Sequence, residues 1–172
     1  MRWKRGWAFL LVLLLFAVPF QPVQAQKSGD CRRLEQALGY KVEAQEGICR
    51  MGLIRKELRV THQGRMLSPE TMELELLANF ERVGDAWVVM GEFALMEPEV
   101  NPVVDRLRQS GLEVTAIHNH MLFERPRVIY LHFQGEGTPE RLAKGVRSAV
   151  RATSYGKRGF KRFPKDRLML PH

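Results

Sequence analysis

Three histidines lie within fifteen positions of one another and are the most prominent group of chemically active side chains in the sequence. His118 and His120 follow the apolar stretch 112–117, and His132 lies in the next apolar run, 128–133. Side chains of a β-strand alternate between its two faces, so we expect His118 and His120 on the same face of one strand. Imidazole nitrogens bind transition metals and form hydrogen bonds with anions. The pattern therefore predicts a metal or ligand site, without deciding between the two.

The pairing of the two strands decides whether His132 joins the other histidines. If His120 lies opposite residue 128, His132 falls on the same face, and the three imidazoles could bind zinc from two neighbouring strands. If His120 lies opposite residue 127, His132 points to the other face and the apolar residues of both strands gather together. The second register makes the better hydrophobic core. A site with two histidines would then need carboxylate ligands, for which the candidates are Glu92 and Glu124.

Anion binding is the alternative chemistry for the same region. Arg125 and Arg127 lie between the two strands, and a guanidinium group pairs readily with a carboxylate or a phosphate. The histidines could also be structural, because a neutral imidazole donates from one nitrogen and accepts at the other. The predicted ligand-binding residues are Glu92, Arg125 and Arg127, and the predicted metal ligands are His118, His120 and His132.

No catalytic motif accompanies these residues in the sequence. There is no nucleophile elbow, no Ser-His-Asp order and no glycine-rich phosphate loop. Three functions stay open. The first is a binding module for a metal ion such as zinc or for a small anionic ligand, and the second is a metal-dependent hydrolase or lyase with a glutamate as base. The third is an envelope-associating protein that acts through its basic C-terminal end.

The first 25 residues have the composition of a secretory signal peptide. Cationic residues precede an apolar core at 6–20, which is short for a membrane span, and small residues lead up to Ala25. We therefore expect export, with cleavage near Ala25 and a periplasmic or secreted product. An uncleaved anchor is the alternative. Lipid attachment is not expected, because Cys31 does not lie in a lipobox.

The two cysteines, Cys31 and Cys49, both lie in the expected mature chain. An oxidising compartment favours a disulfide between them, and closing a loop of this length stabilises a fold by about 3 kcal/mol in the chain-entropy model. Free thiols and a two-cysteine metal site are the alternatives. The wide spacing, without a CxxC, makes a poor zinc motif.

Charge is distributed unevenly along the sequence. Residues 26–140 hold 14 Lys and Arg against 18 Asp and Glu, whereas residues 141–172 hold 10 against one. The excess of positive charge therefore belongs to the end of the chain, and no nucleic-acid partner is expected. We expect one domain over 26–155 and an exposed basic tail over 156–172. Residues 157–167 of that tail could contact an anionic envelope surface.

The order of expected elements predicts an α+β fold, with a mainly antiparallel sheet and helices packed on one face. Asn101-Pro102 is expected to start one helix as N-cap and first helical residue, and Thr138-Pro139 is expected to open the last one. The expected strands are 41–51, 53–61, 72–82, 86–95, 112–117 and 128–133, and the first helix is expected over 31–38.

Several stretches resemble the LppY/LpqO family of exported bacterial proteins, whose function is uncharacterised. The resemblance rests on Val89-Met90-Gly91-Glu92, on Glu99-Val100-Asn101-Pro102-Val103, on the block from Gly111 to His120, on Pro126 to His132 and on Gly135-Glu136-Gly137. It covers about residues 31–153. It implies export and supports the α+β fold, and it leaves the mechanism open. Family members usually have an aspartate where Glu92 stands, and many carry two copies of the unit where this chain has one.

Overall fold

The computed structural model describes residues 28–159, which form an α+β domain as the sequence predicted. The helices are α1 (Ser28–Leu38), α2 (Glu97–Gln109), α3 (Pro139–Ala152) and α4 (Ser154–Gly159). The strands are β1 (Glu43–Gln45), β2 (Ile48–Ile54), β3 (Thr61–His62), β4 (Arg65–Met66), β5 (Glu75–Val83), β6 (Ala86–Met96), β7 (Glu113–Asn119), β8 (Glu124–Arg125) and β9 (Val128–Gly137). The predicted signal peptide and residues 160–172 of the predicted tail lie outside the described residues.

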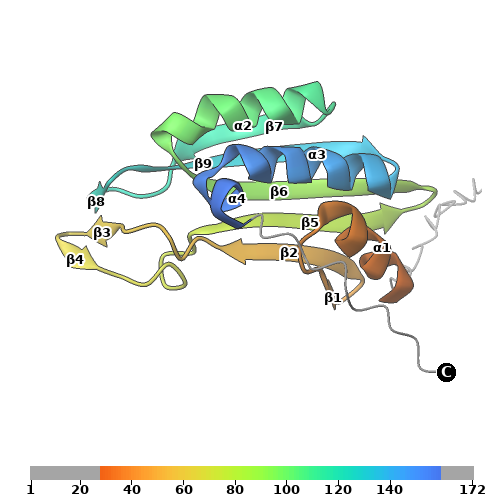
Figure 1. The fold of residues 1–172 in the computed structure, drawn as a ribbon, viewed down its shortest axis with the longest axis horizontal. Coiled ribbons are helices and arrows are strands. Elements are labelled where there is room, and N and C mark those ends of the chain that lie inside the picture. The colour runs from red at the N-terminus through yellow and green to blue at the C-terminus, as the bar shows by residue number, and fades with distance from the viewer. Residues whose placement is uncertain (1–27, 160–172) are drawn as a thin grey trace, which may run out of the picture.

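The main sheet has six strands in the order β1-β2-β5-β6-β9-β7, and every neighbouring pair is antiparallel. The long hairpin of β5 and β6 forms its centre, joined by the turn at 84–85 that the sequence predicted. Helices α1, α2 and α3 lie together on one face (Figure 1). The apolar stripe predicted for the last helix is confirmed, since Leu142, Val146 and Val150 are buried against the sheet.

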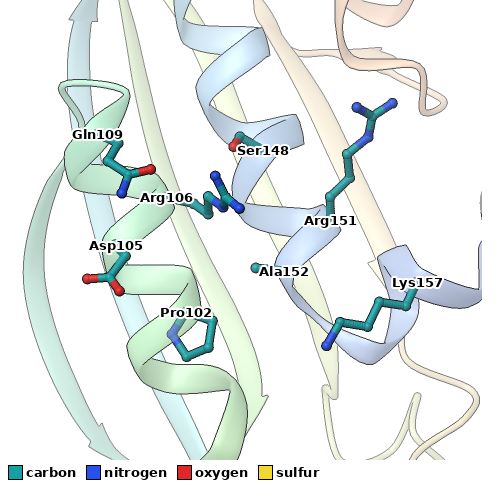
Figure 2. Close-up of a pocket in the computed structure, with 8 residues that line it drawn as sticks. All are labelled: Pro102, Asp105, Arg106, Gln109, Ser148, Arg151, Ala152 and Lys157. Carbon is teal, nitrogen blue, oxygen red and sulfur yellow. The ribbon is translucent and has the colours of Figure 1, made fainter.

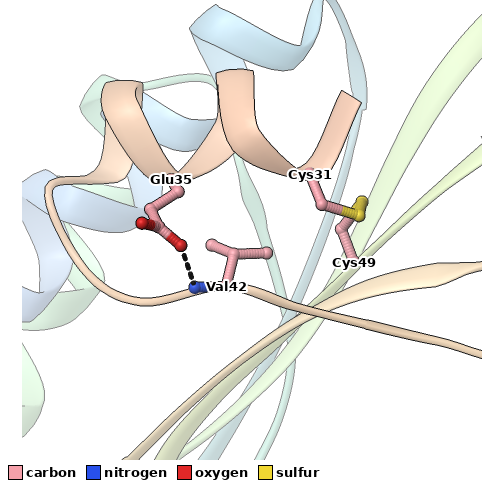
Figure 3. The surroundings of a disulfide bond; sticks show 4 residues. All are labelled: Cys31, Glu35, Val42 and Cys49. Carbon is pink, nitrogen blue, oxygen red and sulfur yellow. Dashed lines mark hydrogen bonds between the residues drawn. A yellow bond between two sulfur atoms is a disulfide. The ribbon is translucent and has the colours of Figure 1, made fainter. Parts of the chain in front are cut away.

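The predicted disulfide between Cys31 and Cys49 is confirmed. It joins α1 to β2, with the two Cα atoms 5.2 Å apart. A second link lies close by, because the Glu35 carboxylate accepts a hydrogen bond from the main-chain N–H of Val42 at 3.0 Å (Figure 3). Both bonds hold the N-terminal helix against the strand edge that follows it. The first helix also ends where predicted, at Gly39, whose φ of +72° favours glycine.

A second, smaller sheet covers one end of the face that carries no helices. Its strands have the order β4-β3-β8. Beneath it lies a separate apolar cluster, which includes Val60, Met72, Ala94, Val128 and Tyr130. Since the small sheet covers only this end, the rest of the face stays open.

The histidine strands pair in the register that places His132 on the face of His118. Ala116 lies opposite His132, and the His120 N–H donates to the Val128 carbonyl oxygen at 3.0 Å. The alternative register, with His120 opposite residue 127 and the apolar residues of both strands gathered together, does not occur. A β-bulge between Val114 and Ala116 explains why, since one extra residue there turns the rest of the strand over. Val114 stays opposite the core residue Phe133, while the side chains beyond the bulge change face.

Helix α2 begins five residues earlier than predicted, with Met96 rather than Asn101 as its N-cap and Glu97 as its first residue. The carboxylate of Glu99 accepts a hydrogen bond from the N–H of Met96, the N-cap residue, at 2.9 Å, and so caps the helix start. Pro102 lies inside the helix. It leaves one main-chain hydrogen bond of the helix unmade there.

The predicted strand at 53–61 is wrong for most of its length, because residues 55–60 form a loop. Arg55 in this loop is fully buried, and its guanidinium donates twice to Glu99, at 2.6 and 2.9 Å. It also donates to the Ala94 carbonyl oxygen, to Ser154 Oγ and to Glu57. The loop therefore packs inward around a buried ion pair that ties together α2, β6 and α4. Helix α4 occupies the start of the stretch that was predicted as an exposed tail.

Candidate functional site

His118 and His132 meet on the open face of the main sheet, and Glu92 lies beside them. The Nε2 atoms of the two histidines are 2.8 Å apart, and their rings are stacked with centroids 5.0 Å apart. The Glu92 Oε2 atom lies 3.1 Å from His132 Nε2. Glu92 and His132 are directly paired residues of β6 and β9, so the strand register itself brings them together.

The hydrogen bonds define which ring nitrogen of His118 carries the proton. Its Nδ1 atom lies 3.0 Å from the main-chain oxygen of Asn119, and a carbonyl oxygen only accepts, so Nδ1 carries the proton. In the neutral ring the Nε2 atom of His118 then has a lone pair, which faces His132 Nε2. His132 Nε2 therefore faces two acceptors, the lone pair of His118 and the carboxylate of Glu92. Two imidazole nitrogens and a carboxylate oxygen thus lie together, and these are donor atoms of the kinds that bind transition metals.

These three side chains line a groove of about 500 Å³ on the open face. Across four adjacent strands, Leu77 is paired with Glu92, Glu92 with His132, and His132 with Ala116. Cross-strand partners share a face, so an apolar residue borders the polar pair on each side. The neighbouring Asn79 also lines the groove, and its Oδ1 atom is buried without a hydrogen-bond partner. An unpaired buried acceptor is costly, and a donor on a bound ligand would satisfy it.

His120 belongs to a different cluster from His118 and His132. Its Nδ1 atom donates to Glu124 Oε2 at 2.7 Å, and its ring stacks on Tyr130 with centroids 4.5 Å apart. The other oxygen of Glu124 accepts from the N–H of Val128 at 2.8 Å. Both His120 and Glu124 are buried, with side chains only 8% and 2% exposed. This arrangement fixes the turn between β7 and β9.

Tyr130 lies between the two histidine clusters and was not expected from the sequence. Its hydroxyl donates to the Glu73 carbonyl oxygen at 2.9 Å. Burial, followed by the negative charge of nearby carboxylates such as Glu92, raises the pKa of Tyr130 well above its usual range. The side chain is therefore a neutral donor that anchors the loop before β5 to the site. An aromatic residue two positions before a predicted ligand on the same strand was the available signal.

Arg125 and Arg127, predicted as ligand-binding residues, do not line the groove. Arg125 lies in the small sheet opposite Thr61, and its main-chain oxygen accepts from the Thr61 hydroxyl. The guanidinium of Arg127 lies 3.6 Å from Glu97, at the start of α2. Of the predicted site residues, the structure therefore brings together His118, His132 and Glu92.

The described residues, 28–159, contain no group of three or more His, Cys, Asp or Glu side chains that could hold a metal ion as they stand. His118 and His132 supply two nitrogen atoms. Glu92 contacts His132, and its side chain is 35% exposed, so it has room to change rotamer. His118 and His132 are therefore two candidate ligands, and Glu92 is the candidate for a third.

A further groove, of about 660 Å³, lies among the helices on the opposite side of the sheet. It is bordered by Asp105 and Arg106 of α2, by Ser148 and Arg151 of α3 and by Lys157 of α4 (Figure 2). Most of these side chains are exposed. Arg106 extends from α2 towards α3, whereas the guanidinium of Arg151 points away from the groove (Figure 2). The groove thus lacks the convergent groups seen around His118.

The main sheet is thus covered by helices on one face and carries a groove lined by histidine and glutamate on the other. The chain belongs to the family described as Domain of Unknown Function (DUF1259), whose model matches residues 32–152. No curated protein and no solved structure matches the chain. Within residues 28–159 no helix has the length and apolar character that a membrane crossing requires.

Proposed function

We propose that this chain is an exported binding module of the cell envelope that holds a divalent transition metal, such as zinc, between His118 and His132. The observation that carries the proposal is the approach of their two Nε2 atoms to 2.8 Å, beside the carboxylate of Glu92. Imidazole nitrogens and a carboxylate oxygen are ligands that zinc uses in proteins. Glu92 becomes the third ligand when its side chain turns from His132 towards the ion.

The surroundings of His118 support a metal ligand over a simple hydrogen-bonded histidine. Metal-binding histidines almost always donate their other ring nitrogen to a carbonyl or carboxylate oxygen, which fixes the tautomer and orients the ring. The Nδ1 atom of His118 makes such a bond to Asn119. The lone pair on Nε2 is thereby directed towards His132, the other proposed ligand.

The charge of the groove favours a cation over an anion. Glu92 is the charged residue nearest to the histidine pair, and a bound carboxylate or phosphate would lie against it. Like charges at such short range repel, more strongly where water is displaced. Arg125 and Arg127, which would have compensated an anion, lie outside the groove. The export signal that the sequence predicts at 1–25 and the disulfide between Cys31 and Cys49 support a place in the envelope.

Elemental analysis of the chain from residue 26 onward, purified without chelator or affinity tag, tests the proposal. We expect close to one transition-metal ion per chain, either as purified or after incubation with zinc and dialysis. The double variant His118→Ala/His132→Ala should lose it. His62→Gln is the matched control, because it removes a histidine from the small sheet and leaves the groove intact. Glu92→Gln should weaken zinc binding in calorimetry by about tenfold or more.

Two outcomes would refute the metal proposal. One is the absence of bound metal in the loaded wild-type chain. The other is metal that the double variant retains and His62→Gln loses, which would place the ion elsewhere. A urea unfolding curve for each variant confirms that lost binding is not lost folding.

A further inference from the structure

The small sheet carries exposed apolar side chains that the histidine groove does not explain. Leu122 and Phe123, in the loop before β8, are 71% and 69% exposed, and Met121 is 36% exposed. Met66 in β4 and the following Leu67 are 53% and 38% exposed. We name these five residues, 66, 67, 121, 122 and 123, the apolar tip. Exposed large apolar residues gathered in one place mark an interaction surface.

The small sheet brings the two segments that carry these residues to the two sides of β3. The N–H of Gln63, in the turn between β3 and β4, donates to the Phe123 carbonyl oxygen at 3.0 Å. Met66 lies opposite Thr61, which lies opposite Arg125, so Met66 and Arg125 share one face of this sheet. β3, β4 and β8 together form one end of the long axis of the molecule (Figure 1). The apolar tip is therefore at the extremity of the fold.

The backbone at Phe123 is held in an unfavourable conformation. Its φ is +63°, in the left-handed region that bulky residues rarely adopt. Asparagine or glycine would relieve the strain at this position. A bulky aromatic side chain that is both strained and exposed is typical of a residue retained for contact with a partner.

The charges around the apolar tip indicate the kind of partner. The charged residues of the small sheet are Arg65, Glu124 and Arg125. Glu124 is buried and bonded to His120, so both exposed charges of this sheet are positive. Apolar side chains that protrude among arginines match the boundary between headgroups and acyl chains of an anionic bilayer. A protein partner would instead need about 20 residues or more on each side.

We propose that the apolar tip inserts into the surface of a membrane rich in anionic phospholipid and holds the domain there. Leu122 and Phe123 enter the acyl boundary, and Arg65 and Arg125 contact lipid phosphates. None of the residues that line the histidine groove belongs to the apolar tip, so membrane contact at the tip does not use the groove residues. The inference concerns a surface separate from the metal site and does not depend on it.

Flotation with lipid vesicles tests this inference on the chain from residue 26 to 172. Vesicles of phosphatidylcholine with 30% phosphatidylglycerol should bind the wild-type chain more tightly than phosphatidylcholine alone. Leu122→Ser/Phe123→Asn should weaken binding about tenfold or more, because each buried apolar side chain contributes about one order of magnitude. Arg65→Gln/Arg125→Gln should weaken it about tenfold at low salt, with less effect at high salt.

The control variant is Val83→Ser/Ile117→Ser. It removes two apolar side chains of similar exposure, 56% and 50%, outside the apolar tip. Its binding should equal that of the wild type. The basic C-terminal end is present in every variant, so its own attraction to lipid cancels in the comparison. Asparagine at 123 tolerates the left-handed backbone, and equal urea midpoints exclude a folding defect.

Three results would overturn the inference. The wild-type chain could fail to bind the anionic vesicles. The tip variants could bind as well as the wild type, which would assign membrane contact to the tail. The wild type could form a dimer in light scattering that Leu122→Ser/Phe123→Asn abolishes without changing vesicle binding, which would make the apolar tip a contact between two copies of the chain.

Discussion

The buried ion pair between Arg55 and Glu99 should make a large and pH-dependent contribution to stability. Burial by itself raises the pKa of Glu99, but hydrogen bonds from Arg55 and from the N–H groups of Ser154 and Met96 outweigh it and hold the pKa at about 2. The ordinary value is 4.5. At about 1.4 kcal/mol for each tenfold change in the acid constant, this difference corresponds to about 3 kcal/mol of folding free energy.

The substitution Glu99→Gln removes this contribution. It leaves the fully buried guanidinium of Arg55 beside Glu57 alone among carboxylates, and breaking a buried pair from one side costs about 3–5 kcal/mol. The estimate from the pKa and the estimate for breaking a buried pair both give a loss of about 3 kcal/mol in the free energy of unfolding at pH 7. The measurement is urea unfolding at several pH values, followed by circular dichroism.

The pH dependence has a definite direction. Because the pKa of Glu99 is lowered in the folded protein, its contribution is complete above pH 4.5 and is lost as the pH falls towards 2. The difference between wild type and Glu99→Gln should therefore shrink over that range. Glu97→Gln, in the same helix turn but 62% exposed and 3.6 Å from Arg127, should cost less than about 1 kcal/mol. Equal stability of Glu99→Gln and wild type at pH 7, or a difference that persists undiminished at pH 2, would refute this reasoning.

Three further substitutions have expected outcomes that thermal or urea unfolding can check. Replacing Cys31 and Cys49 by serine should cost about 3 kcal/mol, and a reductant should lower the melting temperature of the wild type only. Gly91→Ala should destabilise by about 1–3 kcal/mol, because the new Cβ would overlap a buried ring of β9 and lie 2.8 Å from the Leu77 carbonyl oxygen; a neutral effect would contradict this packing. His120→Ala should cost about 1–3 kcal/mol, more than His118→Ala, whose ring is exposed; the reverse order would contradict a structural role for residue 120.

The elements with strong local signals were predictable from the sequence. The β5–β6 hairpin has a glycine turn between two apolar strands, and α3 begins with a threonine cap followed by proline. The disulfide followed from the pairing of two cysteines in an expected oxidising compartment. In the hairpin and the helix the decisive interactions join residues that are near in sequence. For the disulfide, the sequence holds only two cysteines, so one pairing was possible.

Long-range polar contacts could not be predicted from the sequence. Arg55 and Glu99 lie 44 positions apart, and an arginine in a polar segment is normally exposed. Their pairing buries the loop that was predicted as a strand, and the capping bond of Glu99 moves the helix start to Glu97. Nothing in the local composition distinguishes this pair from surface charges.

The candidate site was predictable in its residue types but not in its grouping. Alternation along β7 placed His118 and His120 together, yet the structure groups His118 with His132 and Glu92 and leaves His120 with Glu124. Both histidines lie beyond the bulge and share a face, as their ring contacts with Tyr130 show. The alternation rule was therefore right for this pair. The local pattern did not reveal the bond between His120 and Glu124, which separates His120 from the groove. Whether the grouped residues bind a metal stays a prediction.

The β-bulge at Thr115 allows a single strand to serve two independent requirements. Val114 before it packs towards the helices, and His118 beyond it faces the groove. The side chains on the two sides of the bulge therefore face different selective demands, because the first group must fit the interior and the second must fit a ligand. New binding properties can arise by changes beyond the bulge without any repacking of the interior.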